Sequence, residues 1–209
     1  GGDGSRRRRR AADAGGRGGA CTSTWAADLT DFSFLNSTIG NKTNLKRWLI
    51  ERIIEIQPIR LHEDIKVVLK DEDKVSALGD FNVDDLYFDQ AIQNVLHNSV
   101  KYSYPHTDVR VWAKRLNKSL VISAESTGIP IEDYEKERVF QDRERGDWAI
   151  HYDKVGTGQG LYITRSIMTG FGGEIILEEP QIEDRYVKPP DGFPVATRKI
   201  FKLILPEAF

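Results

Sequence analysis

The chain has 209 residues, enough for one domain of ordinary size with additional segments. Its net charge of −2 and its pI of about 6.1 give the whole chain no general attraction to nucleic acid or anionic lipid, so nucleic acid is an unlikely partner. The single cysteine, Cys21, excludes an intrachain disulfide framework and a cysteine-based metal site, and no apolar run is long enough for a transmembrane helix in this sequence.

Residues 1–22 are a low-complexity segment rich in glycine, alanine and arginine. Such a segment cannot bury enough apolar surface to offset its ordering entropy, so we expect a disordered leader. The alternative is that Arg6–Arg10 form an arm for nucleic acid or an acidic partner. Residues 11–20 lack the apolar core of a signal peptide, and a cytoplasmic location is therefore the expectation.

Residues 23–62 are expected to form a helical segment. Apolar residues recur at helical spacing up to Ile56, Asn41 or Thr43 is the expected N-cap, and Pro58 follows the helix. The spacing favours an amphipathic helix that packs on the following domain or on a partner chain.

Residues 63–209 alternate between strand and helix patterns and are expected to form one domain. Asp84 or Asp85 is the expected cap of its first long helix, and the dipeptide Asn117-Lys118 predicts a tight turn between antiparallel strands. The expected strands are 65–69, 78–83, 108–114, 119–124, 174–178 and 198–205, and the expected helices are 86–102 and 159–169. This order predicts an α+β fold, a two-layer α/β sandwich with helices packed on one face of a mixed sheet.

The helix over residues 86–102 carries a polar stripe. Asn94, Asn98 and Lys101 stand at i, i+4 and i+7 and share one face, while the apolar residues lie on the other side. Carboxamide oxygens are hard ligands of the kind that suit Mg²⁺, and lysine supplies a point charge for phosphate. A solvated polar face is the alternative reading of the stripe.

A glycine-rich segment, Gly156–Leu161, stands at the start of the helix over 159–169 and at the end of a long polar loop, 126–157. Glycines at a helix N-terminus let backbone N–H groups approach an anion. A flexible hinge is the alternative interpretation. Loops as long as 126–157 within a compact domain usually have a function, and we expect a lid over a ligand.

Together these segments resemble the GHKL ATPase superfamily and, within it, the ATP-binding catalytic domain of sensor histidine kinases. Residues 93–103 are similar to the family's N box, residues 156–168 to its G2 box with the following helix, and residues 139–146 to the F box and start of the ATP lid. The resemblance covers about residues 65–206 and implies a Bergerat-type ATP-binding fold.

The resemblance implies that ATP and Mg²⁺ bind between the N-box helix and the lid. Asn98 would bind Mg²⁺ with help from Asn94, Lys101 would contact phosphate, and these three would be the catalytic residues. The further candidate nucleotide contacts are Tyr102, Glu125, Gly128, Ile129, Arg143, Arg145, Gly156, Thr157, Gly158, Gln159, Gly160 and Leu161. Hydrolytic members of the superfamily carry a glutamate at the position of Asn94, and an amide cannot act as a general base, so transfer to a histidine is favoured over hydrolysis.

The sequence departs from the family at the G1 box. Anchoring on Gly128 places Ala124 where an aspartate is expected to hold the adenine amino group, and Ser126 where a glycine is expected. Glu125 would face the other way in a regular strand, although a β-bulge would return it to the pocket.

The phosphoacceptor is the second departure. His62, His97, His106 and His151 are the only histidines, and His62 does not lie on a long helix of a dimerising pair. The helix before residue 62 is therefore a candidate remnant of a dimerisation helix, and the acceptor is expected on a histidine-bearing dimerisation domain or a separate protein, with a homodimer left open. The alternatives to a histidine kinase are a degenerate nucleotide-binding or scaffolding module, and an ATPase or anti-sigma-type kinase.

Overall fold

A computed structural model describes Phe32 and residues 40–57, 63–178, 181–182 and 187–206. The predicted leader over residues 1–22, most of the segment that follows it, and His62 lie outside this part of the chain. Within the described part, no helix has the length and apolar character needed to cross a bilayer.

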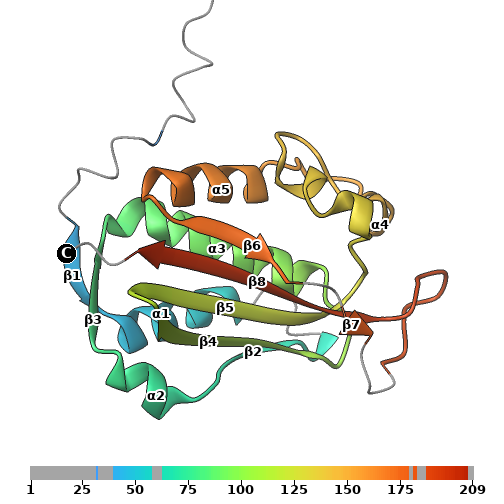
Figure 1. The fold of residues 1–209 in the computed structure, drawn as a ribbon. Coiled ribbons are helices and arrows are strands. Elements are labelled where there is room, and N and C mark those ends of the chain that lie inside the picture. Colours follow the sequence, from blue (N-terminus) through green and yellow to red (C-terminus); the bar gives the residue numbers. More distant parts are fainter. Residues whose placement is uncertain (1–31, 33–39, 58–62, 179–180, 183–186, 207–209) are drawn as a thin grey trace, which may run out of the picture.

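The main sheet has six strands in the order β2-β4-β5-β8-β6, with β7 paired to β8 (Figure 1). The strands are β2 (Lys66–Leu69), β4 (Asp108–Leu116), β5 (Ser119–Gly128), β6 (Glu174–Leu177), β7 (Gln181–Ile182) and β8 (Thr197–Pro206). β2 pairs with β4 in parallel and the other pairs are antiparallel, so the predicted mixed sheet is confirmed. Asn117 and Lys118 both have positive φ, as the tight turn between β4 and β5 requires.

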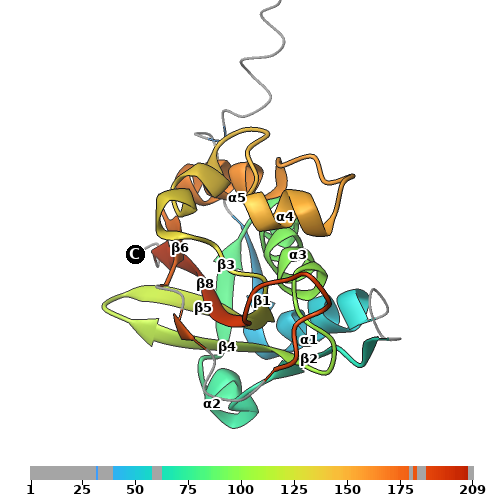
Figure 2. The same ribbon diagram turned by 90° about the vertical axis from the view of Figure 1, so that its right-hand side faces the viewer.

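Three helices cover one face of this sheet: α1 (Leu45–Ile56), α3 (Asp85–Lys101) and α5 (Gly160–Gly170). Figure 2 shows these helices on one side of the strands. Apolar side chains from all three share a core with the inner face of the sheet, including Leu49, Phe88, Ile167, Ile122 and Leu203. The predicted two-layer α+β architecture is thus confirmed.

The start of α1 differs from the prediction. Asn41 and Thr43 do not cap the helix, because both lie in β1 (Asn41–Asn44), which pairs with β3 (Asp80–Val83) and is held extended. Asn44 is the N-cap, and its side-chain oxygen accepts a hydrogen bond from the Arg47 N–H at 3.1 Å. The sequence pattern also missed the short helix α2 (Glu72–Ala77) between β2 and β3.

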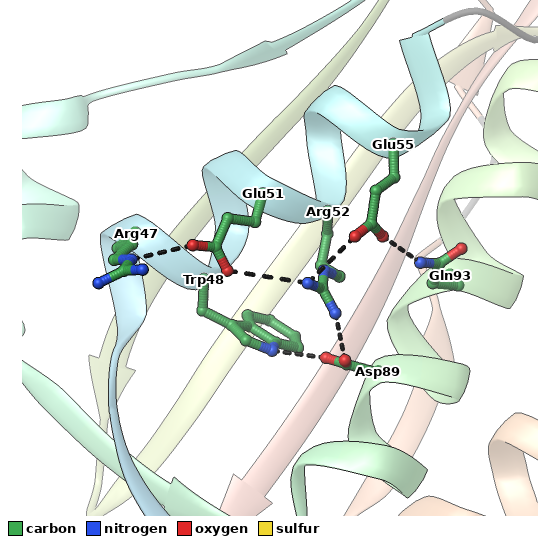
Figure 3. Close-up of polar contacts among 7 residues, drawn as sticks. All are labelled: Arg47, Trp48, Glu51, Arg52, Glu55, Asp89 and Gln93. Carbon is green, nitrogen blue, oxygen red and sulfur yellow. Dashed lines mark hydrogen bonds and ion pairs between the residues drawn. The ribbon is translucent and has the colours of Figure 1, made fainter.

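A polar network joins α1 to α3 (Figure 3). Trp48 Nε1 donates to Asp89 at 2.6 Å, and Arg52 forms ion pairs with Asp89 and Glu55. Gln93 donates to Glu55 from the next turn of α3. α1 therefore shares both a polar network and the hydrophobic core with α3, although the predicted domain boundary at residue 63 lies between the two helices.

The polar segment after β5 is folded rather than irregular. It contains 3-10 turns at Asp133–Glu135 and Arg138–Phe140 and the helix α4 (Asp147–Tyr152). The fully buried carboxylate of Glu135 accepts from the Asp147 N–H at 2.6 Å and from Arg138 at 2.8 Å. These bonds tie the two 3-10 turns to the start of α4, and Figure 1 shows α4 at the same end of the molecule as β7.

Candidate functional site

A cavity of about 340 Å³ lies between α3, the glycine loop 156–160, the lid residues 139–149 and the inner face of β5 and β8. Its volume is within the range of small-molecule sites in proteins. The predicted site residues that line it are Asn94, Asn98, Lys101, Tyr102, Ile129, Arg145, Gly156, Thr157, Gly158, Gln159, Gly160 and Leu161. Glu125, Gly128 and Arg143 do not line it.

The polar stripe of α3 faces this cavity because the opposite side of the helix is buried against the sheet. Phe88, Ile92 and Leu96 are at most 1 % exposed. Asp84 caps the helix, as predicted, by accepting from the Leu86 N–H at 3.2 Å. Asn94 Nδ2 donates to the Gly160 carbonyl at 3.1 Å, so the stripe lies directly across from the glycine loop.

The glycine loop needs glycine at two positions for different reasons. Gly158 has a φ of +74°, and a Cβ added there would lie 2.6 Å from the Arg143 carbonyl carbon. A Cβ on Gly160 would instead point toward Asn98 and Asn94, at 3.6 and 3.8 Å. The loop therefore leads into α5 with its backbone close to the carboxamides and open to the cavity.

Two basic groups at the cavity are held by the lid. Lys101 forms an ion pair with Asp153, and this hydrogen bond lowers the pKa of the Asp153 carboxyl below its usual value. Arg145 donates to the carbonyls of Gly156 at 3.1 Å and Ala149 at 2.6 Å, and also to that of Asp153. Arg145 thus ties α4 and the residue that follows it to the glycine loop.

Arg143 is a correction to the sequence interpretation. Its side chain is 78 % exposed and lies beside Asp142, with its backbone at a φ of +61°. It is not among the residues that line the cavity, so of the two predicted lid arginines only Arg145 lines the site.

Glu125 is a second correction. β5 pairs with β8 in unbroken register from Ser119 to Gly128, so no bulge returns Glu125 to the pocket. The side chain points to the opposite face of the sheet, where it accepts from Arg110 at 3.1 Å. Its neighbour Ala124 is buried in the core, as the regular alternation of a strand requires.

Gly128 is needed for a close approach of two backbone segments and does not line the cavity. A Cβ there would lie 1.9 Å from the Tyr102 carbonyl oxygen, which accepts from the Ile129 N–H at 3.2 Å. The glycine thus permits the end of β5 to approach the end of α3, and this contact places Tyr102 and Ile129 on the wall of the cavity.

Several lining residues were absent from the sequence prediction. Ser126, Lys199 and Phe201 line the cavity from the inner face of the sheet, and Glu144 lines it from the lid. Lys199 is 3 % exposed and donates to the Ile129 carbonyl, and burial lowers its pKa to about 7. Extending the alternation of β8 back from Phe201 by two residues would have placed Lys199 on this face.

His97 also lines the cavity, in agreement with its place in the predicted N-box helix. Burial and the nearby positive charge of Lys101 both lower its pKa, with burial the larger cause. A neutral imidazole therefore prevails on this wall near pH 7.

The donor set for a metal consists of amide oxygens. Among the described residues, no group of three or more His, Cys, Asp or Glu side chains could hold a metal ion. Asn98 and Asn94 present carboxamides next to the glycine loop, and carboxamide oxygen is a hard ligand of the kind Mg²⁺ accepts. Because Mg²⁺ in such sites keeps waters and phosphate oxygens as its other ligands, these residues fit an ion that arrives with a nucleotide.

Comparisons with known proteins identify relatives in sequence and in fold. The chain is 28 % identical over 131 residues to sensor protein IrlS of Burkholderia pseudomallei, covering 62 % of this chain and 27 % of that protein. It is 32 % identical over 114 residues to sensor protein CzcS of Cupriavidus metallidurans, covering 54 % of this chain and 23 % of that protein. The chain thus spans about a quarter of the length of these relatives.

The solved catalytic domain of histidine kinase ThkA, in a nucleotide-free form, has the same fold. It superposes with a TM-score of 0.58 at 19 % identity, covering 80 % of this chain and 95 % of that one. The family model of histidine kinase-, DNA gyrase B- and HSP90-like ATPases matches residues 83–207, which contain α3, the lid, the glycine loop and β8. The chain belongs to this family of ATPases.

Proposed function

We propose that the cavity binds a nucleoside triphosphate with Mg²⁺, ATP being the nucleotide implied by the family, and that its γ-phosphate is transferred to a histidine in another segment or chain. The observation that carries this proposal is the contact between the α3 stripe and the glycine loop. Asn94 reaches the Gly160 carbonyl at 3.1 Å across the mouth of the cavity. Carboxamides, an ammonium group and open backbone amides thereby meet at one place suited to phosphates.

Each group has a distinct role in this proposal. Asn98, assisted by Asn94, would hold Mg²⁺, which when bound neutralises charge on the phosphates. Gly156, Gly158 and Gly160 would offer backbone N–H groups to the phosphate oxygens. Lys101 would exchange its partner Asp153 for a phosphate oxygen, and Arg145 would hold the lid in place over the nucleotide.

The lining of the cavity favours transfer over hydrolysis. Asn94 stands beside the glycine loop, and its amide has no basic lone pair with which to activate water. Glu144 is the only carboxylate among the lining residues, and it comes from the lid rather than from α3. The position on α3 where hydrolytic members of the superfamily carry a glutamate therefore offers no carboxylate to act as the general base.

The partners follow from the same proposal. The acceptor would be a histidine-bearing dimerisation domain or a separate phosphoacceptor protein in the cytoplasm, and a homodimer would bring such a histidine near. A response regulator is a further candidate partner, since the similar histidine kinase ThkA has been solved in complex with the response regulator TrrA. We also propose that the nucleotide-binding domain includes α1, because α1 shares its core and its polar network.

A binding and transfer experiment tests this function. Calorimetry with ATP should show binding that strengthens with Mg²⁺, and [γ-³²P]ATP should label an added histidine-bearing dimerisation domain with acid-labile phosphate. Release of inorganic phosphate without the acceptor should be close to background. Undetectable binding at millimolar ATP, or rapid phosphate release, would contradict the proposal.

A nucleotide-binding module without transfer is the second candidate. It is favoured by Ala124, an apolar residue at the position where the family resemblance leads us to expect an aspartate for adenine. Binding of Mg²⁺–nucleotide with no label on any added histidine domain would select this candidate.

A further inference from the structure

The closed end of the cavity, formed by the inner face of β5 and β8, has an unusual set of polar groups. Ser126 and Lys199 face each other as register partners on the two strands. Both side chains line the cavity and are at most 3 % exposed. The neighbouring Ala124 adds only a methyl group, and Glu125 lies on the opposite face of the sheet. The sheet therefore contributes no carboxylate to this end of the cavity.

Lys199 has hydrogen-bonding capacity to spare at this position. An ammonium group carries three N–H donors and no acceptor. One donor is directed to the Ile129 carbonyl, and among the described residues no carboxylate forms an ion pair with Lys199. Across from it, the Ser126 hydroxyl is buried and has no hydrogen-bond partner among the described residues.

Such groups are costly to bury unless a ligand completes them. A buried polar group that lacks a partner loses its hydration without compensation. Burial does lower the pKa of Lys199, which reports this cost. A ligand that brings hydrogen-bond acceptors to this end of the cavity would satisfy both Lys199 and Ser126.

We propose that Lys199 and Ser126 read the base edge of the nucleotide and select a purine with an oxo group at position 6, as in inosine or guanosine triphosphate, over adenine. This inference rests on the proposed function, which places the triphosphate at α3 and the glycine loop and so directs the base toward the sheet. A 6-oxo purine presents O6 and N7 as adjacent acceptors, whereas adenine places an amino donor at position 6. An adenine amino group would face the Lys199 ammonium, which has no acceptor, and only the Ser126 hydroxyl could accept one of its protons.

Competition among ATP, ITP and GTP tests the inference. ITP differs from ATP at position 6 and lacks the 2-amino group of GTP, so the ATP–ITP pair isolates the oxo group. Calorimetry with Mg²⁺ at pH 6.5, below the pKa of Lys199, should give ITP and GTP a dissociation constant about ten-fold or more below that of ATP.

Variants then assign the preference to the two side chains. Lys199→Met keeps an unbranched, slightly shorter side chain and removes its donors. It should bring the ratio of the ATP and ITP dissociation constants to near one. Ser126→Ala should reduce the ratio by a smaller factor. Lys202→Met is the matched control, because Lys202 lies on the other face of β8 and pairs with Glu178, and it should leave the ratio unchanged.

The outcomes separate this inference from the proposed function. Binding of ATP more tightly than ITP by the unaltered chain would overturn the inference and leave the proposed function intact. Failure of all three triphosphates to bind would overturn both. The comparison of ATP and ITP affinities uses the unaltered chain, so it decides the inference even if a variant does not fold.

Discussion

The two ends of the cavity differ in how they are built. The end proposed to bind phosphates, here the phosphate end, combines side chains spaced three or four residues apart on α3 with consecutive residues of the glycine loop. The end proposed to bind the base, here the base end, combines Ser126 and Lys199, which are far apart in sequence and meet only through the pairing of β5 with β8. The phosphate end resembles the N and G2 boxes of the family in residue type and order, whereas the base end has Ala124 and a buried lysine.

Under the proposed function, each end would constrain a different part of the ligand. Phosphates and Mg²⁺ are common to all nucleoside triphosphates, so their contacts can persist while the base contacts change. Four changes test how independent the two ends are, and they are given from the largest expected effect to the smallest.

Asn98→Ala should weaken the binding of every nucleoside triphosphate, whichever base it carries. Loss of a metal-binding carboxamide is expected to weaken Mg²⁺–nucleotide binding by about 100-fold or more, since even residues that only support a metal ligand are worth about 10–100-fold. Titration with ATP and ITP in the presence of Mg²⁺ measures this. Gln93→Ala is the control, because Gln93 bears the same group on α3 but directs it to Glu55 (Figure 3). An Asn98→Ala variant with unchanged affinity would contradict the metal assignment.

Gly158→Ala should weaken the binding of all nucleotides by about ten-fold. Its φ of +74° costs about 1–2 kcal/mol for a residue with a Cβ, and that Cβ would also meet the Arg143 carbonyl at 2.6–2.8 Å. Gly192→Ala is a matched control, because Gly192 has a φ of +82° but nothing within 4 Å of the added Cβ. Equal nucleotide affinities for the two variants would show that the loop does not bind phosphate.

Lys199→Met should stabilise the folded chain by about 1–3 kcal/mol near or below pH 7 in the absence of nucleotide. The folded pKa of Lys199, about 7, lies below the ordinary 10.5, so its burial opposes folding fully below pH 7. As pH rises from 7 toward 10.5, the unfolded chain binds the extra proton and the wild type regains this stability, so the gain from Lys199→Met should shrink. Chemical denaturation at several pH values measures this. A gain that is independent of pH would contradict a charged Lys199 in the folded state at low pH.

Asp153→Asn should tighten nucleotide binding by about two- to five-fold. Asp153 pairs with Lys101 and would compete with phosphate for it, and partly exposed pairs of this kind are weak. The gain should be equal for ATP and ITP, because Lys101 belongs to the phosphate end. Asp147→Asn, which removes a lid carboxylate paired with Arg138, should give no such gain. Weaker binding by Asp153→Asn would mean that Asp153 positions Lys101 instead of competing for it.

Local signals in the sequence account for most of the phosphate end. The Asp84 cap and the apolar spacing of α3 predict both the helix and the direction of its polar stripe, because helix geometry relates residues three and four apart. The glycine spacing likewise predicts the loop at the start of α5. Predictions that required knowledge of a neighbouring strand were less successful. Asn41 and Thr43 satisfy the composition of a helix cap, but pairing of β1 with β3 holds them in a strand.

The amino-acid sequence by itself determined the polar stripe of α3 and the glycine loop, because each depends on contacts between residues close in the chain. The order of helix and strand patterns along the chain was enough to indicate the α+β class. Only the tertiary structure decided what the base end contains. The regular register of β5 turns Glu125 away toward Arg110, and pairing with β8 brings Lys199 beside Ser126. Strand partners distant in sequence are chosen by the packing of the whole sheet, so the chemistry of a site they share is visible only once the sheet is formed.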